Sequence, residues 1–333
     1  MHPDRFTFLL GLPSLRPGAL WRRAHALGAP VLVSANALSV WSRDTLELRH
    51  WERFDGRHLD LVAHHPVALD SAGFVAARLY GGFPWPIDAY LNLAAAAPWL
   101  WWAAADWCVE PEVAGDNEEV LDRISGTVRL NMLCLNGGER RGIADRFVPT
   151  IQGWHPDDYV RCVERMPWVR DRPLVGVGSM CRRRLHGEHG VLHVLDVLDR
   201  AFDGSAARFH LYGLKSQAIA VAAQHPRVAS ADSQAYGVAA RQNARKAREA
   251  KSDAVVADVM EGWYREQLAQ IARPPPSPVA RRWPPARLQP PECPIEARIA
   301  AAREELRALH EDGEAEWADL NPIRAYEMAF LDE

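Results

Sequence analysis

Short runs of apolar, β-branched or aromatic residues recur along the chain, and longer segments with helical periodicity separate them. The runs cover residues 5–11, 30–35, 66–70, 99–106, 147–153, 173–179, 208–213 and 227–232. Such alternation is typical of βα units in a parallel sheet. Segments with apolar residues three and four positions apart predict helices over 19–28, 117–133, 155–166 and 190–202.

Eight strands with intervening helices predict an α/β fold, a closed (β/α)₈ TIM-like barrel. An open, doubly wound sheet is the alternative. Residues 235–251 predict a basic helix that completes the last repeat. We expect a catalytic barrel domain over 1–270, a proline-rich strap or linker over 271–294, and a C-terminal helical extension over 295–333 that packs on the barrel exterior.

The composition fits a soluble globular protein, with 48% hydrophobic and 25% charged residues. A net charge of −4 does not indicate nucleic-acid binding, so such a function depends on local basic patches. The five cysteines are scattered, without the spacing of a zinc site, which predicts reduced thiols in the cytoplasm, no metal and no cofactor. No apolar run approaches the roughly 20 residues of a membrane span, so no membrane association is expected.

Candidate chemistry comes from the residues that end the predicted strands, because barrels of this kind place their active sites at the carboxyl ends of the strands. Three carboxylates and two amides fall there, which favours an active site. For each acid, helix N-capping is the alternative interpretation. The strand-end residues are Asn36, Asp70, Asp106, Gln152, Ser179, Gly213 and Asp232.

The neighbours of these residues favour contact with a flat ligand. Small residues at 71–73 follow Asp70 and let a ligand approach the backbone, as Gly153 does after Gln152. Asp106 ends a very apolar strand, where a carboxylate is costly unless it binds a ligand or caps the backbone.

In chain order, the motifs LDSAGF, ADWC, IQGW, VGVGS, LYGLKS and SADS resemble those of the tRNA-guanine transglycosylase superfamily. Residues 173–183, 210–216 and 229–237 most resemble its DNA-directed branch, the DpdA-type DNA-guanine transglycosylases, which insert the 7-deazaguanine precursor preQ0 into DNA. The similarity covers roughly residues 30–250.

This resemblance implies a role for each matching residue. Asp232 would be the nucleophile that attacks the anomeric carbon, and Asp70 the general acid/base. Asp106 would hold the N–H groups of the base. The remaining residues of the implied base pocket are Cys108, Gln152, Gly178 and Ser179.

Two departures from the tRNA enzymes favour DNA over tRNA as the partner. The tRNA enzymes carry a CxC…C…H zinc motif after the last strand, where this chain has only Cys293. Tryptophan precedes Cys108 where the tRNA enzymes have glutamate. A zinc-lacking tRNA-guanine transglycosylase and a non-catalytic nucleic-acid-binding barrel in a DNA-modification complex remain the alternatives.

Basic and aromatic residues supply the expected nucleic-acid contacts, with solvated surface and ordinary packing as the alternatives. Residues 281–287 form a further basic segment, and a partner protein that opens the duplex is compatible with this function. The candidate phosphate contacts are Arg182, Arg183, Arg184, Arg241, Arg245 and Lys246, and the candidate stacking residues are Trp107, Trp154 and Tyr236.

Overall fold

The computed structural model describes residues 6–43, 49–247, 252–273 and 293–330. One parallel sheet forms its centre, with the order β7-β6-β5-β2-β1-β11-β10-β9-β8. Its strands are β1 (Thr7–Leu12), β2 (Val31–Ser34), β5 (Val67–Asp70), β6 (Trp102–Ala103), β7 (Phe147–Val148), β8 (Thr150–Ile151), β9 (Leu174–Val177), β10 (Arg208–Leu211) and β11 (Val228–Ser233).

The sheet closes on itself because its two end strands are one segment of chain. Only Pro149 separates β7, which pairs with β6, from β8, which pairs with β9. Proline has no N–H, so it interrupts the ladder at this point, while its carbonyl still accepts a 2.8 Å hydrogen bond from the N–H of Gly176. Eight strands in sequential order therefore form the predicted TIM-like barrel, and the open-sheet alternative is wrong.

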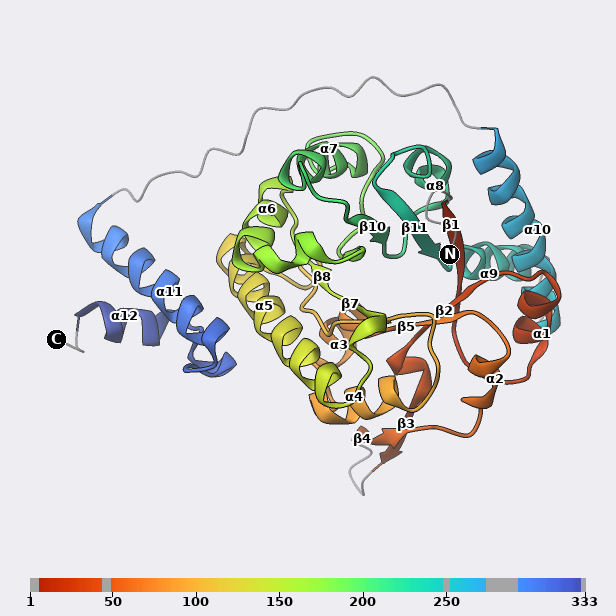
Figure 1. Ribbon diagram of the computed structural model, residues 1–333, viewed down its shortest axis with the longest axis horizontal. Coiled ribbons are helices and arrows are strands. Elements are labelled where there is room, and N and C mark those ends of the chain that lie inside the picture. Colours follow the sequence, from red (N-terminus) through yellow and green to blue (C-terminus); the bar gives the residue numbers. More distant parts are fainter. Residues whose placement is uncertain (1–5, 44–48, 248–251, 274–292, 331–333) are drawn as a thin grey trace.

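Helices surround this barrel, as Figure 1 shows. The helices predicted from periodicity are present, and α5 begins where the Asp116 side chain accepts a hydrogen bond from Glu119 N–H at 2.8 Å. The helices of the barrel are α1 (Ala19–Ala26), α2 (Asp60–Ala63), α3 (Gly73–Tyr80), α4 (Ile87–Ala95), α5 (Asn117–Arg140), α6 (Pro156–Arg165), α7 (Val191–Ala201), α8 (Ser216–Ala222), α9 (Tyr236–Ala247) and α10 (Asp253–Ala272).

Two elements were not predicted. An antiparallel hairpin of β3 (Ser39–Arg43) and β4 (Arg49–Phe54) lies between β2 and β5 in the chain. Helix α10 packs against α1, α8 and α9. The described residues also form four short 3₁₀ helices: η1 (Ala35–Leu38), η2 (Ala144–Arg146), η3 (Pro167–Asp171) and η4 (Trp317–Asp319).

The C-terminal extension consists of α11 (Pro294–Asp312) and α12 (Pro322–Phe330). Helix α11 packs against α5, so the predicted position of this extension on the barrel exterior is confirmed. In Figure 1 both helices lie outside the helical ring, on the side of α5. Residues 274–292, which hold most of the proline-rich segment with its basic stretch 281–287, lie outside the described residues. The domain boundaries at 270 and 294 stay predictions.

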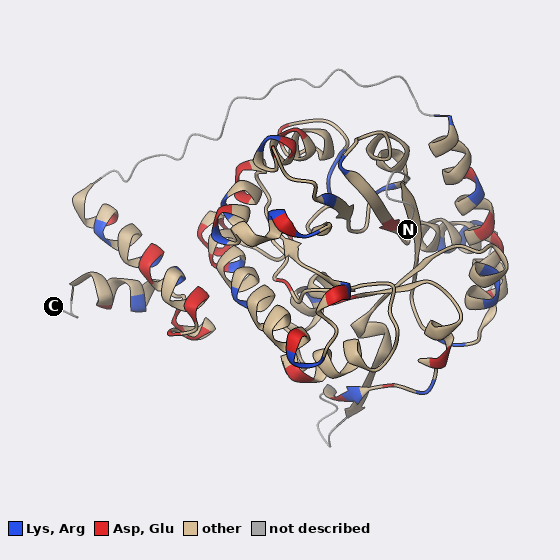
Figure 2. Cartoon of the chain, viewed as in Figure 1, with Lys and Arg blue, Asp and Glu red and all other residues tan. Residues whose placement is uncertain are grey.

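Two apolar layers hold the barrel together. The larger lies between the helices and the sheet. The smaller fills the barrel interior with one or two side chains from most strands, so the barrel is a packed core and not a pore. Figure 2 shows that charged residues lie mainly on the outer helices and loops, with both signs interspersed. The buried interior residues are Leu9, Leu32, Ala68, Trp101, Ala103, Val148, Leu174 and Ala229.

Candidate active site

A cavity of about 190 Å³ lies at the carboxyl ends of the strands. It is smaller than the roughly 300–1,000 Å³ of pockets for drug-sized ligands, so its size suits a single base. The strand-end residue Asn36 is not part of its lining and instead accepts a hydrogen bond from Tyr80 Oη at 3.0 Å. The cavity brings together all seven residues of the predicted catalytic and base-binding set: Asp70, Asp106, Cys108, Gln152, Gly178, Ser179 and Asp232.

Asp70 ends β5 and is followed by a tight turn into α3. Ala72 has a φ of 71°, and its N–H donates to Asp70 Oδ2 at 3.0 Å. Burial, followed by the negative charges of Asp106 and Asp232, raises the pKa of Asp70 to about 8, although backbone hydrogen bonds from Ala72 and Ser71 act to lower it. Asp70 is therefore protonated at neutral pH and can donate a proton to a leaving group.

Asp106 is buried and held by two side chains from neighbouring strand ends. Ser71 Oγ donates to its Oδ1 at 2.7 Å, and Gln152 Nε2 donates to its Oδ2. Burial raises the pKa of Asp106 to about 6, with a contribution from the charge of Glu110, and the two hydrogen bonds oppose this rise. The result is an oriented carboxylate that lines the cavity.

The glycines around this group admit protein side chains instead of a ligand. A Cβ on Gly73 would lie 2.6 Å from the backbone oxygen of Asp106, and a Cβ on Gly178 would lie 2.1 Å from Gln152 Nε2. Both positions therefore require glycine so that Asp106 and Gln152 can approach the neighbouring strand ends. The expectation that these small residues serve close ligand approach gains no support from this packing.

Asp232 near the end of β11 has one bonded and one free oxygen. The N–H of Gly213, which has a φ of 65°, donates to Asp232 Oδ1 at 2.8 Å. The buried ring of His210 places Nε2 3.3 Å from the same oxygen. No described residue donates a hydrogen bond to Oδ2, so this oxygen can react with a ligand in the cavity.

Glu110 is a fourth carboxylate of the cavity that was missed in the sequence. It is 1% exposed, and Ser179 Oγ lies 2.9 Å from its Oε2 and 2.7 Å from Gln152 Oε1. Ser179 carries one hydroxyl proton and can donate to only one of these oxygens at a time. Glu110 is thus linked through Ser179 and Gln152 to Asp106. Its position four residues after a strand-end acid is the signal that could have revealed it.

Cys108 also lines the cavity, and its Sγ lies 3.7 Å from the carbonyl oxygen of Gly73. Burial raises the pKa of this thiol far above its ordinary value, and the charges of Glu110 and Asp106 add to the shift. Cys108 therefore lines the cavity as a neutral thiol and not as a thiolate nucleophile.

The three arginines after Ser179 differ in their surroundings. Arg183 is 2% exposed, and its guanidinium donates to the backbone oxygens of residues 153, 179 and 189 and to Tyr159 Oη. We therefore withdraw Arg183 as a phosphate contact, because these protein oxygens occupy its donors. Arg182 and Arg184 are exposed, and Arg182 Nε lies 3.5 Å from Glu112.

The other nucleic-acid candidates also separate into exposed and packed residues. Helix α9 carries three exposed cations, at positions 241, 245 and 246. Tyr236 is buried and donates to the backbone oxygen of Gly11 at 2.7 Å, so the expectation that it stacks on a base is wrong. Arg183 lies over the ring of Trp154, and Trp317 stacks on Trp107.

A larger cavity, of about 960 Å³, lies at the opposite end of the strands. Its lining residues lie before or at the starts of β6, β7, β9 and β10, with one residue near the start of β11, and it lacks the cluster of carboxylates described above. Because barrel chemistry occurs at the carboxyl ends of the strands, the smaller cavity is the candidate active site. In the part of the chain that the structure describes, no group of three metal-ligating side chains forms and no helix could cross a bilayer.

Comparison with known families agrees with this geometry. No curated protein gives a significant match to the chain. The family model DpdA, described as DeoxyPurine in DNA protein A, matches residues 46–307. This range covers most of the chain and contains all seven residues of the predicted catalytic and base-binding set. The chain therefore belongs to the DpdA family.

Proposed function

We propose that this protein is a DNA-guanine transglycosylase that exchanges guanine in DNA for a 7-deazaguanine base such as preQ0. The observation that carries the proposal is one base-sized cavity that contains a protonated acid, Asp70, and a carboxylate with a free oxygen, Asp232. Membership of the DpdA family supports DNA as the substrate.

In the first step, Asp232 Oδ2 attacks the anomeric carbon of the target deoxyribose. The bond from this carbon to guanine breaks as an ester bond to Asp232 forms, and Asp70 gives its proton to the departing base. The products are free guanine, an ionised Asp70 and a sugar bound covalently to the enzyme.

In the second step, the incoming deazaguanine loses its N9 proton to Asp70, and N9 attacks the same anomeric carbon. The ester bond breaks, which regenerates the Asp232 carboxylate and the protonated Asp70. Two displacements retain the configuration of the sugar, for the same chemical reason that retaining glycosidases use a pair of carboxyl groups.

Guanine and a deazaguanine share their carbonyl and amino edge, so one set of contacts can hold both. The Asp106 carboxylate has lone pairs beyond those used by Ser71 and Gln152 and would accept the N–H groups of this edge. Gln152 and the backbone at Gly178 and Ser179 would contact the carbonyl, and Cys108 would face the ring.

The target nucleotide must leave the base stack to enter the cavity, which costs a few kcal/mol in a duplex. We propose that exposed cations hold the DNA backbone while this occurs, with a DNA-opening partner as an aid on duplex DNA. These cations are Arg182, Arg184, Arg241, Arg245 and Lys246.

The direct test is incorporation of labelled guanine or preQ0 into DNA by the purified protein. We expect label in DNA with the wild type and a loss of more than about 10³-fold with Asp232→Ala. The matched control is Asp196→Asn, which changes a half-buried acid of α7 that is ion-paired with Arg200 four residues away. Activity equal to wild type in Asp232→Ala would remove Asp232 from the nucleophile role.

The same assay separates the proposal from its alternatives. Single-stranded DNA, duplex DNA and tRNA are supplied in parallel arms. Label in tRNA alone would indicate a zinc-lacking tRNA-guanine transglycosylase. DNA binding without label in any arm would indicate a non-catalytic nucleic-acid-binding barrel and would contradict the proposal.

A further inference from the structure

An aromatic pair connects the C-terminal extension to the base side of the candidate active site. The ring of Trp317, in η4 after α11, stacks on the ring of Trp107 with centroids 4.5 Å apart and planes 5° apart. Trp107 lies between Asp106 and Cys108, two residues that line the cavity. Trp317 lies beyond the range that matches the family model.

Helix α5 is shaped to receive both rings. A Cβ on Gly126 would lie 2.7 Å from Cδ1 of Trp107 and 2.9 Å from Cζ3 of Trp317, so only glycine fits at this position. Glycine inside a helix costs roughly 0.5–1 kcal/mol relative to alanine. This cost in the middle of a long helix is explained by the indole pair that it admits.

The backbone beside Trp107 is held from the same helix. The N–H of Trp107 donates to Thr127 Oγ1 at 2.9 Å, and Arg123 Nη1 donates to the carbonyl oxygen of Cys108 at 3.3 Å. The Arg123 guanidinium also lies 5.5 Å from the centre of the Trp107 ring. Trp107 is thus held both by α5 and by the ring of Trp317.

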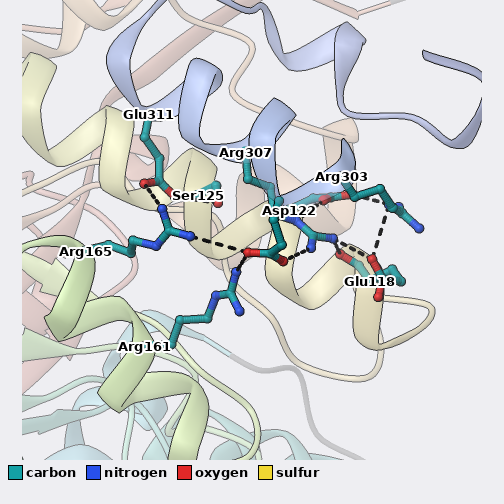
Figure 3. A network of polar contacts seen from close by, with 9 residues as sticks. Glu118, Asp122, Ser125, Arg161, Arg165, Arg303, Arg307 and Glu311 are labelled. Carbon is teal, nitrogen blue, oxygen red and sulfur yellow. Dashed lines mark hydrogen bonds and ion pairs between the residues drawn. The ribbon is translucent and has the colours of Figure 1, made fainter. Parts of the chain in front are cut away.

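Helix α11 fixes the position of Trp317 through a buried ion-pair network, which Figure 3 shows between α5, α6 and α11. Arg307 is 1% exposed, and it donates to Asp122 Oδ1 and to Glu118 Oε2, each at 2.7 Å. Ser125 Oγ donates to Glu311 Oε1 at 2.7 Å. Ion pairs and hydrogen bonds therefore attach the extension to the helix that receives the two indoles.

The turn after α11 continues this attachment toward the aromatic pair. Arg129 Nη1 donates to the carbonyl oxygen of Ala315 at 2.6 Å. The ring of His310 packs against Trp317 with centroids 5.9 Å apart. Contacts of α11, of the turn that follows it and of Trp317 thus connect the ion pairs to Trp107.

From these contacts we infer that Trp317 is a positioning residue for base recognition, which holds the Asp106–Cys108 segment in place through the ring of Trp107. The inference rests on the proposed function. Trp317 does not line the cavity, so its loss is expected to raise the KM for the free base and to leave the displacement steps at Asp232 and Asp70 unchanged.

The test compares Trp317→Ala, Trp317→Phe and the control Tyr326→Ala. Tyr326 is an exposed aromatic of α12 in the same extension, and its described ring contact is with Phe330 of that helix. Two readouts are taken: KM and kcat for the base in the exchange assay, and hydrogen exchange of backbone amides over residues 104–110.

We expect Trp317→Ala to raise KM by about 3- to 10-fold, the size of a lost aromatic pair, with a similar acceleration of amide exchange over 104–110. Trp317→Phe keeps a stacked ring and is expected to retain most of the wild-type values. Tyr326→Ala is expected to match the wild type. Equal behaviour of Trp317→Ala and Tyr326→Ala in both readouts would overturn the inference, as would a fall in kcat without a rise in KM.

Two further outcomes remain decisive. Faster exchange of the α11 amides in Trp317→Ala would mean that the extension itself has loosened. Trp317→Leu is then the variant to test, since leucine keeps apolar volume at this position but has no ring face. Faster exchange confined to 104–110 then supports the inference, and unchanged exchange there overturns it. If the wild type inserts no base into any nucleic acid, the proposed function fails, and hydrogen exchange alone decides whether Trp317 positions the segment.

Discussion

Two clusters of carboxylates, one at the barrel mouth and one at the junction of α5 with α11, differ in the groups that bind them. The cluster at the barrel mouth has hydrogen bonds from serine, glutamine and backbone groups, and no arginine or lysine among the described residues pairs with it. Its members are Asp70, Asp106, Glu110 and Asp232. The cluster at the junction with α11 is paired by Arg161, Arg165, Arg303 and Arg307, and its members are Glu118, Asp122, Glu304 and Glu311.

The difference separates carboxylates that are ion-paired in the fold from those that we propose serve chemistry. At the junction, burial acts to raise the pKa of Glu304, but the charges of Arg161 and Arg307 outweigh it and hold this pKa below its ordinary value. For Asp122 and Glu311, burial outweighs the neighbouring arginines and the pKa is raised. At the mouth, no arginine or lysine among the described residues opposes burial, the hydrogen bonds oppose it only in part, and the pKa of Asp70 rises to about 8. Uncompensated carboxyl groups in a cavity are costly to folding, and such groups cluster at functional sites.

After loss of the Asp232 carboxylate, the largest expected effect at the mouth comes from Asp70→Asn. Asparagine keeps the shape of the side chain but can neither donate a proton to guanine nor accept one from the incoming base. We expect kcat for exchange to fall by about 10²- to 10⁴-fold, while the base dissociation constant changes little. Exchange assays and calorimetric titration with the base measure these two quantities. Normal exchange by this variant would remove Asp70 from the acid/base role.

The matching change at the junction is Arg307→Ala, which leaves Asp122 buried without its closest cation. Removal of one partner from a buried ion pair typically costs about 3–5 kcal/mol, so we expect the free energy of unfolding in urea to fall by that amount. The control is Arg200→Ala, whose exposed pair with Asp196 contributes about 0–1 kcal/mol. Equal losses in the two variants would contradict the contrast between junction and surface.

Most of the barrel could be predicted from sequence because its strands and helices differ in hydrophobic period. Helix α10 was missed, although Ser252 as N-cap and buried Val256, Met260 and Tyr264 at four-residue spacing would have predicted it. The β3–β4 hairpin interrupts the βα alternation, and an alternation rule does not anticipate an insertion.

Some residues of the site could be predicted from the local sequence, whereas the surroundings of others depend on tertiary contacts. Strand-end position alone placed Asp70, Asp106 and Asp232 around one cavity, because barrel topology converts a local position into a shared location. Burial of Arg183 depends on the course of its loop over residues 153 and 189, which no local pattern encodes. The Trp107–Trp317 stack could not be predicted from the sequence for the same reason, since it joins segments that are distant in the chain.

The dependence of the unfolding free energy on pH tests the protonation of Asp70 without an activity assay. The pKa of Asp70 is about 8 in the folded protein and 3.8 ordinarily, so between these values the folded state binds a proton that the unfolded state lacks. Stability therefore falls as pH rises from about 5 to 8, by on the order of a few kcal/mol from this group. We expect Asp70→Asn to flatten the curve of unfolding free energy against pH. An unchanged curve would show that Asp70 is not held protonated.

The smallest expected effect comes from Glu110→Gln, which removes one charge from the mouth while an amide can still bond to Ser179. Burial is the main cause of the raised pKa of Asp106, and the charge of Glu110 adds to it, so the variant should lower this pKa from about 6. More Asp106 is then ionised at pH 5.5, where the ionised carboxylate accepts base N–H groups better. We expect base affinity at pH 5.5 to improve by about 2- to 5-fold, with little change at pH 8. Calorimetric titration across this pH range measures the effect.

The control is Glu112→Gln, an exposed acid two residues along the same loop. If the base affinity of Glu110→Gln fell between pH 8 and pH 5.5 by the same factor as that of the wild type, the carboxylates of the mouth would not act as an electrostatically coupled group.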